Sequence, residues 1–173
     1  MPRPAVLALT TTVSKAARPA RGRQGGSDMA ARRTVNGKAA VAHFDEIPSQ
    51  PQPDTGAEWK PVRHFFDLGS FGASLYVGHA DGEVLTSEHS ETDDAGTRHE
   101  ELFYVAQGRA TFVVDGEEVD APAGTFVYVR DPDVRRGAVA REPGTVVFVA
   151  GGAPGEAYEV SPWEREEFGP PAG

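Results

Sequence analysis

Apolar and polar residues alternate over short segments from Trp59 onward, and glycine-marked turns separate these segments at intervals of about ten residues. This pattern predicts an all-β sandwich or barrel. The segments predicted as strands are 62–68, 71–79, 82–90, 100–106, 110–114, 125–129, 137–141, 145–150 and 157–160. Asp81-Gly82 and Asp115-Gly116 are typical of hairpin turns, because glycine adopts the positive φ angle that these turns require. Only 163–168 shows a helical pattern.

The region before these strands has a different character. Residues 1–36 lack apolar periodicity and are rich in Ala, Arg, Gly, Thr and Ser, which predicts a disordered basic extension. Met29 is a plausible alternative start of the chain. Residues 37–60 contain a Pro-rich stretch and are expected to form an arm or linker, 61–163 the barrel, and 164–173 a C-terminal tail.

Composition narrows the class of protein. The net charge is −9, although residues 1–38 carry eight Lys or Arg against Asp28 alone, so the remaining chain is strongly acidic. An acidic body argues against nucleic-acid binding. The chain contains no cysteine, which excludes disulfides and thiolate metal sites. It also has no apolar run long enough to span a bilayer, so we expect a soluble, cytoplasmic protein.

Ionisable side chains gather on two predicted strands. His89 and Glu91 share one side of a strand, whereas Glu101 shares a side with Phe103 on another, directly after His99. Carboxylates are rarely buried without a partner, so these positions are unusual for a plain core face. They are the candidate functional residues of the chain.

The stretch from His99 to Gly137 resembles the cupin family of small β-barrels. The E-x6-G half of the first cupin motif is present as Glu101 to Gly108, and Gly124 fits the opening glycine of the second. The resemblance covers roughly residues 60–163. It implies a single-domain, RmlC-like jelly roll that pairs as a homodimer.

The metal-ligand positions of the cupin motifs are poorly matched. The H-x-H pair would fall near 94–97, where there is no histidine, and its nearest analogue is His89-Ser-Glu91. The histidine of the second motif maps to Arg135, and a guanidinium cannot ligate a cation. Glu101 is instead expected to form an ion pair, with Arg135 or Arg109.

Three functions remain open, and the residues do not decide whether the chain is an enzyme. The first is binding of a small polar or anionic molecule at the barrel mouth, without an obligatory metal, through Arg135, Glu101, Tyr128 and Phe103. The second is a metal-dependent dioxygenase or isomerase with Fe, Mn, Zn or Ni held by His89, Glu91, His99 and Glu101. The third is a metal-free epimerase or isomerase in which His99 is the general base.

Overall fold

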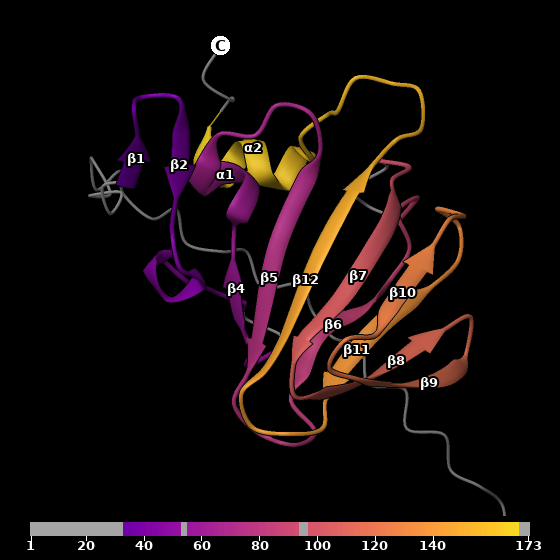
Figure 1. Ribbon diagram of the computed structural model, residues 1–173. Helices are drawn as coiled ribbons and strands as arrows, with labels where there is room; N and C mark the ends of the chain where they lie inside the picture. Colours follow the sequence, from indigo (N-terminus) through magenta and orange to yellow (C-terminus); the bar gives the residue numbers. More distant parts are fainter. Residues whose placement is uncertain (1–32, 53–54, 94–96, 170–173) are drawn as a thin grey trace, which may run out of the picture.

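The computed structural model describes residues 33–52, 55–93 and 97–169 (Figure 1). The elements are β1 (Arg33–Val35), β2 (Ala39–Val41), η1 (Phe44–Glu46), β3 (Gln50–Pro51), β4 (Glu58–Lys60), α1 (Val62–Phe66), β5 (Gly72–Gly78), β6 (Val84–His89), β7 (Glu100–Gln107), β8 (Arg109–Val114), β9 (Glu117–Pro122), β10 (Phe126–Val129), β11 (Arg136–Ala140), β12 (Thr145–Gly152) and α2 (Pro162–Phe168). Among these described residues, no helix is long and apolar enough to cross a membrane.

Two antiparallel sheets face each other. One has the strand order β10-β7-β12-β5-β4-β3 and the other the order β6-β11-β8-β9. Alternating side chains of both sheets fill the space between them, as in β8, where Ala110 and Phe112 are buried. Phe112 meets Phe103 of β7 edge to face, with ring centroids 5.3 Å apart. The predicted all-β jelly roll is therefore confirmed.

The strand predictions hold for most of the barrel but fail at 62–68 and 157–160. Segment 62–68 contains the helix α1 because Pro61 presets its entry, accepting a bond from the Phe65 N–H, and Asp67 ends it in the left-handed region (φ 58°). Segment 157–160 forms no strand. Both sides of the preceding strand, β12, are already paired, with β5 and β7.

Strand β9 was not predicted. Its sequence is acidic and ends in proline, and Ala121 is its only buried residue. Such residues are tolerated because β9 is an edge strand that pairs only with β8.

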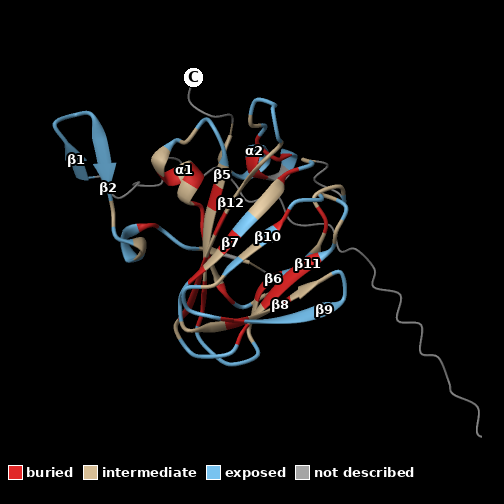
Figure 2. Cartoon of the chain, turned by 45° about the vertical axis from the view of Figure 1, so that its right-hand side comes forward, coloured by how far each residue is buried: buried red, intermediate tan, exposed pale blue. Residues whose placement is uncertain are grey.

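The predicted boundaries also change at both ends of the barrel. Residues 33–35, within the predicted disordered extension, form an exposed hairpin with β2 (Figure 2), while Met29 and the rest of 1–32 lie outside the described residues. The predicted tail begins inside α2. Glu164 of this helix is buried and accepts a hydrogen bond from the Arg63 Nε–H of α1 at 2.7 Å. The two helices are thereby joined at one end of the barrel.

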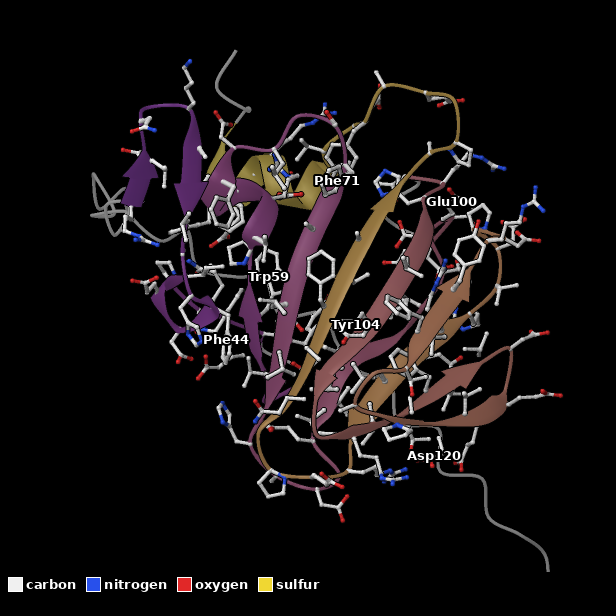
Figure 3. All side chains as sticks on the ribbon, in the orientation of Figure 1. Phe44, Trp59, Phe71, Glu100, Tyr104 and Asp120 are labelled. Carbon is white, nitrogen blue, oxygen red and sulfur yellow. The ribbon has the colours of Figure 1, made fainter. Side chains whose placement is uncertain are left out.

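One apolar row crosses the outer face of the six-stranded sheet. Leu75, Phe148, Tyr104 and Phe126 lie opposite one another on β5, β12, β7 and β10, and the rings of Tyr104 and Phe126 stack with centroids 4.5 Å apart. Tyr104 is labelled in Figure 3. Leu102 and Tyr128, another facing pair, are exposed beside this row. This surface lies on the side of the sheet opposite the core.

Candidate functional site

A cavity of about 480 Å³ opens at the end of the barrel where β6 and β12 finish and β5 and β7 begin. Its walls come from these four strands, from Trp59 of β4 and Arg63 of α1, and from the segment 158–164. The ionisable residues that line it are Arg63, Tyr76, His89, Glu91, Asp93, His99, Glu101, Tyr158 and Glu164. The cavity is therefore large enough for a small metabolite, and ionisable groups share its wall with apolar and aromatic side chains.

The predicted group His89, Glu91, His99 and Glu101 comes together on one wall. His89 Nε2 lies 3.4 Å from Glu91 Oε1 and 3.9 Å from Glu101 Oε2. His99 Nδ1 lies 3.6 Å from Glu91 Oε2. Candidate ligand atoms of His89, Glu91 and Glu101 all fall within 4.8 Å of one another.

The backbone holds these carboxylates in place. The Glu91 N–H donates to the Pro132 carbonyl and the Glu91 carbonyl accepts from Arg98, both at 2.9 Å, while the Thr97 hydroxyl donates to the Glu91 carboxylate. Gly151 lies opposite Glu101 on β12, and a Cβ there would fall 3.2 Å from the Glu101 Cγ. The glycine thus leaves room for the Glu101 side chain.

Glu101 pairs with Arg136, not with Arg135 or Arg109. Arg136 is fully buried, its Nε lies 3.1 Å from Glu101 Oε2, and its Nη1–H donates to the Pro132 carbonyl at 3.3 Å. The Nε contact is within ion-pairing distance but lacks the alignment of a hydrogen bond.

Arg135 occupies the outer surface and does not line the cavity. It is half exposed, donates to Glu88 Oε1 at 2.8 Å and to Asp93 Oδ2 at 3.0 Å. Successive residues on a strand point to opposite faces, so a shift of one position exchanges outside for inside. Ala138 and Ala140, both buried, have the same parity on β11 as Arg136, in agreement with its inward side chain. Arg109 lies elsewhere, in an ion pair with Asp120.

Phe103 and Tyr128, which were predicted to contact a ligand, also lie outside this cavity. Phe103 is only 2% exposed and belongs to the core between the sheets. Tyr128 is 54% exposed on the outer apolar face, where its hydroxyl donates to Glu100 at 2.5 Å. An inward-facing strand position leads to the core or to the cavity depending on its depth in the barrel, and alternation alone does not give that depth.

The segment 158–164 supplies wall residues that strand patterns did not reveal. Tyr158 stacks on His99 with ring centroids 5.1 Å apart, and the Arg63 guanidinium lies 5.9 Å from its centroid. Burial raises the pKa of Tyr158 to about 12. A Cβ on Gly72 would fall 2.9 Å from the Tyr158 hydroxyl, so Gly72 makes room for this ring. These contacts join residues far apart in sequence, and no local pattern signals them.

The protonation of His89 follows from its hydrogen bond. Its Nδ1 lies 2.8 Å from the Ser87 carbonyl oxygen, which can only accept, so Nδ1 carries a proton. In the neutral ring, Nε2 is then an acceptor directed at two carboxylates. Burial by itself would lower the pKa of His89, but the Glu91 hydrogen bond, the Ser87 carbonyl and the Glu101 charge together raise it.

The two carboxyl groups are shifted in opposite directions. Burial, together with the negative charge of Glu91, raises the pKa of Glu101 to about 7 despite His89 and Arg136. Burial also opposes ionisation of Glu91, but hydrogen bonds from His89 and Thr97 lower its pKa. Burial lowers the pKa of His99 despite the charges of Glu91 and Glu164. The wall therefore holds one carboxyl group whose pKa is raised to about 7 beside one whose pKa is lowered.

Comparison with known proteins identifies the fold. No family model and no curated protein matches the sequence. Among solved structures, KdgF from a Halomonas species is 23% identical with a TM-score of 0.51, over 67% of this chain and 92% of that one. A sugar phosphate isomerase of the cupin superfamily from Silicibacter pomeroyi is 17% identical with a TM-score of 0.52, over 65% and 74%. The chain has the cupin fold.

A third solved structure agrees with the barrel architecture. A conserved protein with a double-stranded β-helix domain from Klebsiella pneumoniae is 18% identical with a TM-score of 0.52, over 72% of this chain and 97% of that one. At these identities the likeness establishes the fold, and chemistry must be argued from the site.

The donor set of this site also fits a divalent cation. One imidazole nitrogen and two carboxylates are ligands that Zn, Mn, Fe and Ni accept. Bonds of about 2.1 Å place tetrahedral ligands about 3.4 Å apart, close to the His89–Glu91 separation of 3.4 Å. The bond from His89 Nδ1 to a backbone carbonyl is the usual support of a ligating histidine. Arg136, which already pairs with Glu101, is the one feature that opposes a second cation.

The raised pKa of Glu101 predicts a pH-dependent stability. Because its pKa is about 7 in the folded chain against 4.5 for an exposed glutamate, protonated Glu101 favours folding. That contribution is complete below pH 4.5 and is lost as the pH rises through 7. Between pH 4 and pH 8, the free energy of unfolding should therefore fall less for Glu101→Gln than for the unaltered chain. The two decreases should differ by at most about 3 kcal/mol.

Urea unfolding at a series of pH values, with EDTA present, measures this difference. Only the slope with pH is compared, because Glu101→Gln also leaves Arg136 without its charged partner. Glu88→Gln, a change of an exposed carboxylate outside the cavity, is the matched control. Parallel pH profiles for Glu101→Gln and the unaltered chain would contradict the assignment.

Proposed function

We propose that this cupin binds a small polar organic molecule in the cavity, and that His89, Glu91, His99 and Glu101 form hydrogen bonds with its polar end. The observation that carries the proposal is the convergence of His89 Nε2, Glu91 and Glu101 in a cavity of about 480 Å³. The negative charges of Glu91 and Glu101 oppose each other, so a ligand that donates hydrogen bonds to them relieves this repulsion.

The positions of the arginines support an anionic ligand less than the sequence did. The expected partner of such a ligand, Arg135, does not line the cavity and pairs with Glu88 and Asp93. Arg136 is fully buried, pairs with Glu101 and does not line the cavity. Arg63 does line it, but this arginine already pairs with Glu164. His99 as an independent general base gains no separate support, because its ring is packed against Tyr158.

Metal binding is the second candidate, favoured by the ligand spacing and by the bond that orients His89. His89, Glu91 and Glu101 would hold the ion, with His99 beside them. Such an ion would polarise a bound oxygen as a Lewis acid. The residues themselves would then position the ligand, and Glu91 would keep its bonds to Thr97 and to the backbone of the 90–98 loop.

Ligand-observed NMR with a library of small polar fragments tests the proposed function. We expect fragments that bind the unaltered chain to be lost with Ser74→Phe, because Ser74 lines the cavity and the larger ring fills it. Ser70→Phe is the matched control, since Ser70 is exposed and outside the cavity. Fragments that bind both variants equally would place binding elsewhere and contradict the proposal.

Elemental analysis tests the metal candidate. After dialysis against Zn²⁺ or Mn²⁺ and removal of free ion, the candidate requires about one ion per chain. Glu91→Gln and His89→Ala should reduce that content at least about tenfold, whereas Glu88→Gln should keep it. Metal retained equally by all three variants, or absent from the unaltered chain, rejects a metal at this site.

A second copy of the chain is the partner that we propose for the outer apolar face of the six-stranded sheet. Phe126 and Tyr128 are 63% and 54% exposed there, which is unusual for large aromatic residues of a monomer. Sedimentation equilibrium should give a dimer at micromolar concentration, and Phe126→Lys should shift it toward the monomer by introducing an unpaired charge. A monomeric unaltered chain would exclude this partner.

A further inference from the structure

We propose that the ligand of the cavity carries a positively charged ammonium group, which binds between His89, Glu91 and Glu101. The inference rests on the proposed function and adds the chemical class of the ligand. It follows from the distribution of charge on the cavity wall, from the hydrogen-bonding capacity of the three side chains, and from a buried hydroxyl that lines the same cavity.

The wall carries one carboxylate that no arginine or lysine neutralises. Among the described residues, Glu164 pairs with Arg63 at 2.5 Å, Asp93 with Arg135 at 3.0 Å, and Glu101 with Arg136 at 3.1 Å. In the described part of the chain, Glu91 forms ion pairs with His89 and His99 alone. A cationic ligand would complete the charge balance of the wall, whereas an anionic one would add to its excess of negative charge.

The hydrogen-bonding capacity of the same atoms matches an ammonium. Nδ1 of His89 donates to the Ser87 carbonyl, and Nε2 of the charged ring donates to Glu91. A bound cation favours loss of the Nε2 proton, and the neutral ring then offers Nε2 as an acceptor beside two carboxylates. An ammonium has three N–H donors and no acceptor, while a hydroxyl has one donor. Three acceptors that converge within 4.8 Å therefore suit a primary amine better than an alcohol.

The spacing needs only a small adjustment. Hydrogen bonds of about 2.8 Å in tetrahedral directions place the acceptors about 4.6 Å apart. The His89–Glu91 and His89–Glu101 separations are 3.4 and 3.9 Å. Glu91 is held by Thr97, whereas the His89 side chain is one-third exposed, so rotation of the His89 ring is the movement that would widen both separations.

An unpartnered polar group on the same cavity points independently to a ligand. Ser161 lines the cavity, is 8% exposed, and its Oγ has no hydrogen-bond partner in the described part of the chain. Burying a hydroxyl in that state is unfavourable unless a bound molecule or water supplies the bond. Trp59 and Tyr76 line the same cavity and offer ring surfaces to the apolar body of an amine.

Isothermal titration calorimetry with three probes of one carbon skeleton tests the charge preference: benzylamine, benzyl alcohol and benzoate. Titrations use the full chain at pH 7.5 in phosphate buffer with EDTA. We expect benzylamine to bind at least about tenfold more tightly than benzyl alcohol, and benzoate to bind most weakly. This comparison needs no altered protein.

Two variants then locate the binding. Glu91→Gln removes the unneutralised charge and should weaken benzylamine at least about tenfold, while benzyl alcohol changes by less than about twofold. Glu88→Gln, outside the cavity, should leave both unchanged. Ser74→Phe should abolish binding of every probe. Near-ultraviolet circular dichroism of each variant checks that the chain is folded.

The outcomes separate the inference from the proposed function. Tighter binding of benzoate or benzyl alcohol than of benzylamine, lost with Ser74→Phe, would overturn the ammonium inference and keep the cavity as a binding site. Benzylamine binding that Glu91→Gln leaves unchanged would also overturn it. If none of the three probes binds, the inference and the proposed function are contradicted together.

Discussion

The buried ion pair between Arg136 and Glu101 connects the two sheets at the base of the cavity. Arg136 belongs to β11 of the four-stranded sheet and Glu101 to β7 of the six-stranded sheet, so their contact at 3.1 Å crosses the barrel interior. A fully buried guanidinium is costly without a counter-ion, and removing one partner of such a pair typically costs about 3–5 kcal/mol. The position of Glu101 is therefore fixed by the stability of the barrel as well as by its function.

This pairing decides the charge of the whole site. Arg136 forms an ion pair with Glu101, and Arg63 forms one with Glu164 of α2. Both arginines are therefore neutralised by carboxylates of the chain itself. Glu91 is left with two imidazoles, and its orientation comes from Thr97 and the 90–98 loop. The same pairs that stabilise the structure thus leave one side of the cavity negative, which sets the kind of ligand it accepts.

The sequence predicts most of the barrel because alternation and turn residues are local. It also predicts the grouping of His89, Glu91, His99 and Glu101, since each lies on or beside a strand whose inward face is recognisable. The sequence places Arg135 in the barrel interior, whereas the structure has Arg136 there. The second cupin motif is matched without its proline and glycine, so the match does not fix which residues of the strand face inward. The burial of Ala138 and Ala140 in the structure does fix it. Tyr158, Ser161 and Glu164 reach the cavity through contacts with residues about a hundred positions earlier, such as Arg63, and no local pattern contains that information.

A proton, a divalent metal and an ammonium compete for the same three acceptor atoms of His89, Glu91 and Glu101. All three satisfy the need for positive charge, but they differ in the spacing they require and in what else they demand of the cavity. A proton needs no space, and the pKa of about 7 for Glu101 shows that the site takes one near neutral pH. A metal fits the present spacing but adds two charges next to Arg136. An ammonium adds one charge, and the carbon skeleton of the amine would occupy the rest of the cavity beside Trp59 and Tyr76. The unpartnered hydroxyl of Ser161 is available there for a further polar group of the ligand. Of the three, only the organic cation accounts for the cavity as well as for the acceptors.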